Sequence, residues 1–433
     1  MSQTQLIYQH YLDSRIICTD TRNISQGCLF FALKGENFDA NTFAEEALNQ
    51  GAAYAIIDNA AYQVNSWCIL VDDVLTALQD LARYHRSQLR IPVIGLTGSN
   101  GKTTTKELIN AVLSEKYRTF ATTGNLNNHI GVPLSVLSIQ DDTEIAVIEM
   151  GANHQKEIEL LSSIAQPTHG LITNIGMAHL DGFGGFEGVK KGKAELFHYL
   201  KKVKGTAFIN RDNPYVTEMS IASNLDHLVY YGTEGTNFIT GQLLESDPII
   251  ALSWKGRDES FTVKTNLTGV YNFENILAAI CIGAFFNLTV EQINKGLEGY
   301  MPKNNRSQLT KTKTNTVICD FYNANPSSMS AALKNISTLN ADTKIAILGD
   351  MFELGAESEQ QHEEIAALAE TSGLNTILFL GKHFYRLKDK YKGQFFMNTI
   401  DAQEWLKENP IKNSLVLLKG SRGMALEQLM PVL

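Results

Sequence analysis

Short apolar runs recur along the whole chain, and polar residues follow most of them. Residues 28–33 (CLFFAL), 91–96 (IPVIGL) and 376–382 (TILFLGK) are rich in β-branched and aromatic side chains, as buried strands are. Between such runs, stretches such as residues 104–116 (TTKELINAVLSEK) carry apolar residues at helical spacing. Strands that alternate with helices in this way predict an α/β fold built on parallel sheets.

The pattern divides the chain into three predicted domains, at residues 1–82, 83–302 and 303–433. The first contains short strand-like runs and one helical pattern, and it is expected to be a small α/β unit. The second begins with a helical segment that leads into the strand at residues 91–96. The third alternates strand and helix down to a last predicted helix at residues 424–430 (MALEQLM), which predicts a doubly wound, Rossmann-like sheet.

A glycine-rich segment joins the first strand and helix of the central domain. In GLTGSNGKTTTKE, Gly98 and Gly101 let the backbone turn its N–H groups inward, which forms an anion site at a helix start. Lys102 can reach the β- and γ-phosphates and Thr103 can hold Mg²⁺. The usual phosphate loop has glycine at the position of Leu96, so this is a shortened variant. A simple glycine turn is the alternative, and the strand–loop–helix context disfavours it.

Three further side chains of the central domain are candidates for chemistry. Glu149 ends the strand EIAVIE and could hold Mg²⁺, although a solvated strand-end carboxylate is equally consistent with its position. His179 lies in the glycine-rich loop that follows residues 169–176, where a structural histidine is the alternative. Lys193 belongs to a helical pattern with several lysines, so its position alone indicates only a charged face.

Two loops of the third domain combine polar groups with strand ends. DFYNANPSSMSAAL, from Asp320, places asparagines before a proline; it could face a polar ligand or form a turn in which Ser327 or Ser328 caps the helix. KGSRG, residues 419–423, follows an apolar strand and suits a carboxylate or phosphate. A surface turn with solvated charges is the alternative for KGSRG.

Composition narrows the classes of partner. The 433 residues are 44% apolar and 19% charged, as in ordinary globular proteins, and the net charge of −9 argues against non-specific nucleic-acid binding. Five scattered cysteines without metal or redox spacing suit a reducing cytoplasm. No signal peptide is recognised at the N-terminus, and the longest apolar run, residues 276–286, is too short to span a bilayer. We therefore expect a cytoplasmic protein, without nucleic-acid or membrane partners, that acts as a monomer.

Together these motifs resemble the Mur ligases, the ATP-dependent amide-bond ligases of peptidoglycan precursor synthesis. The resemblance covers nearly the whole chain and rests on TGSNGKTTT, residues 122–137 (TTGNLNNHIGVPLSVL), EMGAN, NIGMAHLDGFG, GKAELF, YNANPSSMSAAL, GDMFELG and KGSR. It explains the shortened phosphate loop, which is the ATP loop of this family. The C-terminal motifs are similar to those of the last ligase in the series, and the Asn-Pro-Arg type motif of the preceding ligase is absent.

The resemblance implies a role for each candidate residue. Catalytic and metal-site roles fall to Lys102, Glu149, His179, Thr103 and Lys193, the last of which the family carbamylates. ATP contacts are implied for Gly98, Ser99, Asn100, Gly101, Lys102, Thr103, Thr104, Asn272, Asn275, Arg306 and Asp320. Substrate contacts are implied for Thr21, Arg22, Lys34, Asn125, Asn127, Asn128, Tyr322, Asn323, Asn325, Lys419 and Arg422.

The implied reaction transfers the γ-phosphate of ATP to the terminal carboxylate of a UDP-muramoyl-tripeptide. The amine of D-alanyl-D-alanine then attacks the acyl phosphate, so the phosphate is a leaving group. Two anions must meet in such a reaction, which explains a need for Lys102 and two Mg²⁺ ions. The third domain would close over the site and exclude water from the acyl phosphate.

Some positions depart from the family pattern, and other activities compete with this one. Cys319 stands where the family often has an acid, Tyr271 where many members have histidine, and residues 39–41 read Asp-Ala-Asn in place of Asp-Gly-His. The alternatives are an earlier Mur-type ligase, a folylpolyglutamate synthetase, a degenerate ligase, or a phosphate-loop nucleotide switch without ligase activity. A GTPase would need an Asn-Lys-x-Asp motif after a strand, and the chain has none.

Overall fold

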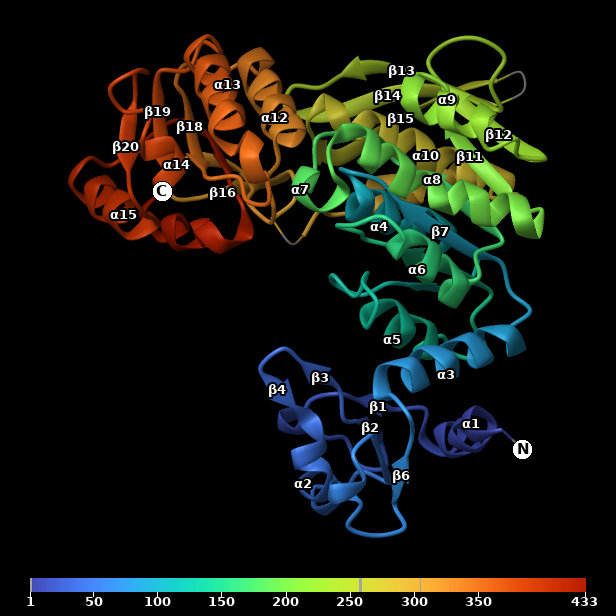
Figure 1. Ribbon diagram of the computed structural model, residues 1–433. Coiled ribbons are helices and arrows are strands. Elements are labelled where there is room, and N and C mark those ends of the chain that lie inside the picture. The colour runs from blue at the N-terminus through green and yellow to red at the C-terminus, as the bar shows by residue number, and fades with distance from the viewer. Residues whose placement is uncertain (1, 257–258, 304) are drawn as a thin grey trace.

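The computed structural model describes residues 2–256, 259–303 and 305–433. The chain forms three lobes that follow one another along the sequence, and each is built around its own main sheet (Figure 1). Helices lie beside these sheets, and the sheets are dominated by parallel strands. The predicted α/β class is therefore confirmed.

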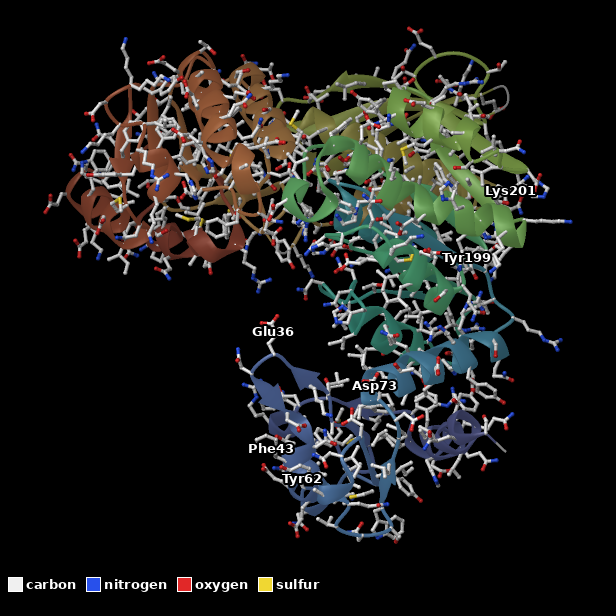
Figure 2. All side chains as sticks on the ribbon, viewed as in Figure 1. Glu36, Phe43, Tyr62, Asp73, Tyr199 and Lys201 are labelled. Carbon is white, nitrogen blue, oxygen red and sulfur yellow. The ribbon has the colours of Figure 1, made fainter. Side chains whose placement is uncertain are left out.

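The N-terminal lobe contains a four-stranded parallel sheet in the order β1-β2-β5-β6. Its strands are β1 (Ile17–Cys18), β2 (Leu29–Phe31), β5 (Tyr54–Ile57) and β6 (Cys68–Leu70), and its helices are α1 (Gln3–Ser14), η1 (Thr21–Asn23), η2 (Ala40–Phe43), α2 (Ala44–Asn49) and η3 (Ala60–Tyr62). A separate hairpin, β3 (Lys34–Gly35) and β4 (Phe38–Asp39), extends from this sheet. Glu36 at the turn of the hairpin points away from the body of the lobe (Figure 2).

The central lobe is built on a nine-stranded sheet in the order β15-β14-β13-β12-β11-β10-β7-β9-β8. Its strands are β7 (Val93–Thr97), β8 (Thr119–Ala121), β9 (Ile145–Glu149), β10 (His169–Ile172), β11 (Thr206–Asn210), β12 (His227–Gly232), β13 (Ile239–Glu245), β14 (Ile249–Lys255) and β15 (Ser260–Thr268). All pairs among β7 to β13 are parallel. Strands β14 and β15 extend the sheet with antiparallel pairs.

Helices cover both faces of the central sheet because its strands bury side chains on both sides. These helices are α4 (Lys102–Leu113), α5 (Gly131–Leu137), α6 (Glu157–Ala165), α7 (Leu180–Phe183), α8 (Phe186–Val203), α9 (Pro214–Ala222), η4 (Val270–Asn272), α10 (Phe273–Phe285) and α11 (Val290–Gly299). In β9, Ala146 and Ile148 belong to one buried apolar cluster, whereas Ile145 and Val147 belong to another. This alternation is the expected behaviour of a buried parallel strand, and it explains the continuous apolar runs in the sequence.

The C-terminal lobe has a six-stranded sheet in the order β16-β17-β21-β18-β19-β20. Its strands are β16 (Gln308–Lys311), β17 (Thr316–Asp320), β18 (Lys344–Gly349), β19 (Thr376–Leu380), β20 (Gln394–Phe396) and β21 (Leu415–Lys419); its helices are α12 (Pro326–Thr338), η5 (Gly355–Glu357), α13 (Ser358–Glu370), α14 (Lys382–Tyr385), α15 (Thr399–Glu408), η6 (Arg422–Met424) and η7 (Leu426–Val432). All pairs are parallel except β16–β17. The last predicted helix is a 3-10 helix, η7, which contains Pro431.

One helix joins the first two lobes. Helix α3 (Val74–Gln88) runs from the N-terminal sheet to strand β7, so the predicted boundary between residues 82 and 83 falls inside it (Figure 1). The three domain limits stay predictions. Among the helices that the structure describes, none is both long and apolar enough to cross a bilayer.

Candidate active site

A cavity of about 660 Å³ lies where the phosphate loop, the ends of β9 and β10 and the C-terminal lobe meet. Most of the predicted site residues line it: Ser99, Asn100, Gly101, Lys102, Thr103, Thr104, Asn125, Asn127, Asn128, Glu149, His179, Asn272, Asn275, Arg306, Asp320, Tyr322, Asn323, Asn325 and Lys419. Because parallel strands present their carboxyl ends at one edge of a sheet, residues far apart in sequence meet here.

The glycines of the phosphate loop are required by the space around them. Gly101 has φ +76° and precedes α4, and a Cβ there would lie 2.7 Å from Oδ1 of Asn275. Asn275 Oδ1 also accepts a hydrogen bond from the Thr105 hydroxyl at 3.0 Å, and its amide donates to Asn272 at 2.9 Å. The predicted adenine-site asparagines therefore pack directly against the loop and help to fix its shape.

The end of strand β10 holds the other side of the loop, which the sequence did not indicate. Asn174 accepts a hydrogen bond from the backbone N–H of Asn100 at 2.9 Å, and the Thr173 hydroxyl donates to the Asn100 carbonyl at 2.6 Å. The Ser99 hydroxyl donates to the Gly176 carbonyl at 3.1 Å and accepts from the Gly176 N–H at 2.9 Å. The sequence pattern could have indicated these two residues, since Thr173 and Asn174 directly follow an apolar strand and polar residues at strand ends often face a ligand site.

Lys102 folds back over the loop from which it comes. Its Nζ donates to the carbonyl oxygens of Gly98 at 2.8 Å and Ser99 at 3.3 Å. Burial lowers the pKa of Lys102, and the nearby Glu149 carboxylate opposes this effect. An anion placed in the loop would offer this ammonium a better partner than two neutral carbonyl groups.

Glu149 is a buried carboxylate with one oxygen satisfied and one free. Oε1 accepts hydrogen bonds from the Thr103 hydroxyl at 3.2 Å and from the Asn127 amide at 2.8 Å. Oε2 is buried without a hydrogen-bond partner among the described residues, and Nζ of Lys106 lies 4.0 Å from it. An unpartnered carboxylate oxygen beside a threonine hydroxyl fits a Mg²⁺ ion, whose other ligands would be phosphate oxygens and water.

His179 follows strand β10, and Lys193 of helix α8 reaches the segment that follows strand β9. Nδ1 of His179 contacts Oε2 of Glu353, which belongs to the C-terminal lobe. Lys193 is 2% exposed; its Nζ donates to the Ala152 carbonyl at 3.2 Å and lies 5.0 Å from the centre of the Phe183 ring. Burial, with a smaller effect from Lys102, holds the pKa of Lys193 well below its usual value. A lysine in this setting favours its neutral amine.

No three His, Cys, Asp or Glu side chains of the described residues converge as a ready metal centre. Any divalent ion here would therefore depend on ligands that a bound nucleotide or substrate supplies. This is the usual situation for Mg²⁺ at phosphate-transfer sites, where few protein groups bind the ion directly.

Two arginines flank the ring of Tyr322 at the mouth of the C-terminal lobe. The Arg306 guanidinium carbon lies 3.8 Å from the ring centre and that of Arg422 lies 5.1 Å from it. Nε of Arg306 is buried without a hydrogen-bond partner in the described part of the chain. A buried donor without a partner is costly, so Arg306 is well suited to accept an anionic ligand.

Asp320 and Lys419 form an ion pair at the ends of neighbouring strands. Nζ of Lys419 lies 2.6 Å from Oδ2 of Asp320, and Lys419 is 2% exposed. Oδ1 of Asp320 accepts from the Ser307 N–H at 3.2 Å. The charge of Lys419, predicted to contact substrate, is thus already balanced within the protein.

The start of helix α12 differs from the predicted arrangement. Neither Ser327 nor Ser328 is the cap; Asn325 caps the helix, since its Oδ1 accepts from the Ser328 N–H at 2.9 Å. The Asn325 amide donates to Oδ1 of Asn100 at 2.8 Å, and the Ser327 hydroxyl accepts from the Met177 N–H at 2.9 Å. The predicted cap was wrong because proline suits the first helical position: the helix begins at Pro326, so the residue before it, Asn325, is the cap. The Asn325 contact joins the C-terminal lobe to the phosphate loop, and the Ser327 contact joins it to the segment after strand β10.

Three predicted substrate residues lie in the N-terminal lobe and do not line this cavity. Arg22 is paired with Asp20 at 2.6 Å beside Thr21, and Lys34 is paired with Asp58 at 2.7 Å. Lys34 belongs to the β3–β4 hairpin, which projects toward the other lobes (Figure 1). Gly98, Lys193 and Arg422 also stand outside the cavity lining, although each contacts or adjoins a residue within it.

Comparison with known families accounts for most of the chain. Residues 14–86 match the domain described as "Mur ligase family, catalytic domain", residues 96–283 match the Mur ligase middle domain, and residues 305–422 match the "Mur ligase, glutamate ligase domain". These three segments correspond to the three sheets of the structure in order.

Individual relatives and solved structures of the same family are similar to this chain over nearly its whole length. The UDP-N-acetylmuramoyl-tripeptide–D-alanyl-D-alanine ligase of Bacillus subtilis is 38% identical over 95% of this chain and 92% of its own length. The ligase of that name from Escherichia coli is 34% identical over 96% of this chain and 93% of its own length. A crystal structure of MurF from Acinetobacter baumannii superposes with a TM-score of 0.87 at 33% identity, over 96% of this chain and 92% of that one. MurF ligase from Thermotoga maritima, in complex with ADP, also gives 0.87, at 26% identity over 100% and 98%. With this identity over nearly its full length, the chain belongs to the Mur ligase family.

Proposed function

We propose that this protein joins D-alanyl-D-alanine to UDP-N-acetylmuramoyl-tripeptide, with ATP converted to ADP and phosphate, in peptidoglycan precursor synthesis. The tripeptide carboxylate takes the γ-phosphate and becomes an acyl phosphate. The dipeptide amine then attacks the acyl carbon and phosphate leaves, which gives the new amide. The printed names of the relatives in Bacillus subtilis and Escherichia coli support this choice of substrates.

One observation carries the proposal: the phosphate loop and the YNANP segment share one cavity. The Asn325 amide donates to Asn100 of the loop at 2.8 Å, so the C-terminal lobe contacts the nucleotide site directly. A nucleotide switch without ligase activity has no need for a second lobe at its phosphates. A ligase needs one, because its acyl phosphate must be protected from water while the amine arrives.

The phosphates of ATP would be bound by the loop N–H groups and Lys102. Thr103 and the free oxygen of Glu149 would hold one Mg²⁺ ion. Asn272 and Asn275 would face the adenine end and Arg306, with its unpartnered Nε, would contact the nucleotide anion. Asp320, which also lines the cavity, would contribute through its pair with Lys419.

A second Mg²⁺ ion would lie near His179 and Lys193, between the γ-phosphate and the tripeptide carboxylate. Mg²⁺ in this position neutralises the charge of two anions that must approach one another. Only a neutral amine can be carbamylated, and burial lowers the pKa of Lys193 in that direction. Carbamylation would turn a repelling ammonium into an anionic ligand for the ion.

The nucleotide end of the sugar substrate would bind between the lobes. Thr21, Arg22 and Lys34 would contact the uridine diphosphate, and residues Asn125, Asn127 and Asn128 would lie beside the sugar. Tyr322, Asn323, Asn325, Lys419 and Arg422 would form the dipeptide side of the site. We further propose that the protein works as a cytoplasmic monomer, where both substrates and ATP are small dissolved molecules.

The proposal is tested by phosphate release from ATP with Mg²⁺ and bicarbonate. Purified protein is incubated with UDP-muramoyl-tripeptide alone, with D-alanyl-D-alanine alone, or with both. The mass of the product is measured by mass spectrometry. Release that requires both substrates, with a mass gain equal to the dipeptide, is the expected result. Turnover with a single amino acid and a shorter peptide would assign an earlier Mur-type ligase. Release without either substrate would overturn the ligase proposal in favour of a nucleotide-hydrolysing switch.

A further inference from the structure

A contact between His179 and Glu353 joins the central lobe to the C-terminal lobe. Nδ1 of His179 is buried and makes no aligned hydrogen bond with the described residues, and Oε2 of Glu353 lies against it; 23% of the histidine side chain and 56% of the glutamate side chain are exposed. The sequence did not single out Glu353, which lies within the segment GDMFELG.

Both residues have a left-handed backbone conformation. His179 has φ +53° and Glu353 has φ +62°, and neither is glycine. Residues other than glycine in this region carry a conformational cost, and they concentrate at functional sites where the surrounding fold enforces them. Here two such residues come from different lobes and face one another.

The surrounding packing enforces the contact. Leu354, next to Glu353, is 3% exposed within the core of the C-terminal lobe. Gly355 has φ +55°, and a Cβ on it would lie 2.8 Å from Oδ1 of Asp181, two residues beyond His179. The loop at residues 351–355 therefore rests closely on the start of α7, and it brings Glu353 to the imidazole only while the lobes are together.

We propose that Glu353 is a positioning residue which, when the C-terminal lobe docks, holds His179 as the Nδ1–H tautomer and turns Nε2 toward the metal site. A histidine that binds a metal through one ring nitrogen generally donates its other N–H to a carboxylate or carbonyl, which fixes the ring and raises its basicity. Here the carboxylate comes from a different lobe. This inference rests on the proposed function, because it takes His179 as a ligand of the second ion.

The arrangement couples two events. Docking of the C-terminal lobe prepares His179 for the ion, so by reciprocity the bound ion strengthens docking. The site would then be complete only in the conformation that also excludes water. If the ion binds only after the lobe has docked, phosphate transfer begins only in a closed site. In an open site, water would hydrolyse the acyl phosphate.

The first test observes the tautomer directly. The ¹⁵N shifts of the His179 ring are recorded by NMR in the full-length protein at one neutral pH, with His179→Gln used only to assign the signals. The wild type is expected to show a protonated Nδ1 and an unprotonated Nε2. Glu353→Ala should give a mixture of tautomers, whereas Glu353→Gln should retain the wild-type pattern, because its amide oxygen can still accept from Nδ1–H. Equal spectra for wild type and Glu353→Ala would overturn the proposal.

The second test measures the metal ion without any ligase substrate. Binding of Mn²⁺ in the presence of ADP is followed by electron paramagnetic resonance. Loss of a carboxylate behind a metal-binding histidine typically lowers affinity 10- to 100-fold, so Glu353→Ala should weaken the Mn²⁺ that depends on His179 by at least about 10-fold. Glu357→Gln, which removes a carboxylate from the same exposed segment, is the matched control and should bind as the wild type does.

The results of the two tests distinguish a failure of this inference from a failure of the proposed function. If Glu353→Ala and Glu357→Gln bind Mn²⁺ alike, Glu353 does not position a metal ligand, whatever the enzyme catalyses. If the tautomer and Mn²⁺ affinity change as expected while no substrate pair is joined, the positioning role stands and the proposed reaction fails. Glu353→Gln keeps the shape of the loop and an acceptor for Nδ1–H, so a mixture of tautomers in that variant would also overturn the proposal.

Discussion

Lys106 directs its buried ammonium toward the free oxygen of Glu149, with Nζ 4.0 Å from Oε2. The same Nζ donates to the Thr122 carbonyl at 2.6 Å, and the two side chains are 3% and 1% exposed. Lys106 thus supplies the positive charge nearest to a buried carboxylate. It follows the phosphate loop by only a few residues, yet its Nζ lies beside Thr122 and Glu149 rather than at the loop.

Lys106→Met should leave Glu149 buried without this compensating charge. Removal of one partner of a buried pair costs about 3–5 kcal/mol, so the melting temperature in the absence of divalent ions should fall clearly. Mg²⁺ with ADP should restore much of the loss, because the ion replaces the missing cation. Lys116→Met is the control; its Nζ donates to the Asn287 carbonyl at 2.7 Å on the surface, and its loss should be nearly neutral. Equal melting of both variants would contradict the role of Lys106.

A second prediction concerns Tyr322, because Arg306 and Arg422 both lie over its ring. Tyr322→Ala removes the surface on which both guanidinium groups rest. Two cation–π contacts of roughly 0.5–1 kcal/mol each correspond to a Kd for ADP raised about 5- to 30-fold, which calorimetry would measure. Tyr322→Phe keeps the ring and should bind ADP within about twofold of the wild type. A loss as large in Tyr322→Phe as in Tyr322→Ala would show that the hydroxyl matters rather than the ring.

Local pattern was enough to predict the fold class and the place of the site. Buried strands of a parallel sheet are apolar on both faces, so β7 and β9 stand out as continuous runs, and the residues after them lie at the sheet edge where ligands bind. The spacing of Gly98, Gly101 and Lys102 added the chemistry. This information is contained in neighbouring residues, so it can be read without the tertiary structure.

Contacts between distant segments could not be predicted in that way. Lys419 and Asp320 are 99 residues apart, and their pairing depends on β17 and β21 becoming neighbours in the sheet. The contact of Glu353 with His179 depends on how two lobes dock. The cap of α12 was wrongly predicted for a local reason: two serines and two asparagines could each cap the helix, and the proline that follows Asn325 favours Asn325.

Lys193→Ala should abolish amide formation and leave the fold intact. Burial lowers the pKa of Lys193 and so disfavours its charged form, which means that its loss should remove little charge stabilisation from the fold. Activity, by contrast, would lose the anionic ligand that carbamylation supplies. The measurement compares dipeptide addition by mass spectrometry with thermal melting. For the wild type, removal of bicarbonate should lower the rate and its return should restore it. Turnover by Lys193→Ala equal to the wild type would remove Lys193 from the mechanism.

His169 should make the protein less stable in mild acid. Its ring packs among Phe208, Phe285 and Phe286, and burial lowers its pKa to about 4. In the unfolded chain a histidine has a pKa near 6.5. Between about pH 4 and pH 6.5 the unfolded state therefore binds a proton at this residue and the folded state does not. The free energy of unfolding therefore falls as the pH drops from about 6.5 to about 4, by roughly 3 kcal/mol at most from this residue.

His169→Gln should remove that part of the pH dependence. Glutamine stays neutral and keeps a polar group beside the Thr168 hydroxyl, which lies 2.9 Å from Nδ1 of His169. Urea unfolding at pH 7 and at pH 4.5 gives the comparison: the wild type should lose more stability between the two than His169→Gln does. His198→Gln, at an exposed position of α8, should behave as the wild type. If His169→Gln lost as much stability in acid as the wild type, the proton uptake would have to be assigned to other residues, because a neutral side chain cannot bind the proton.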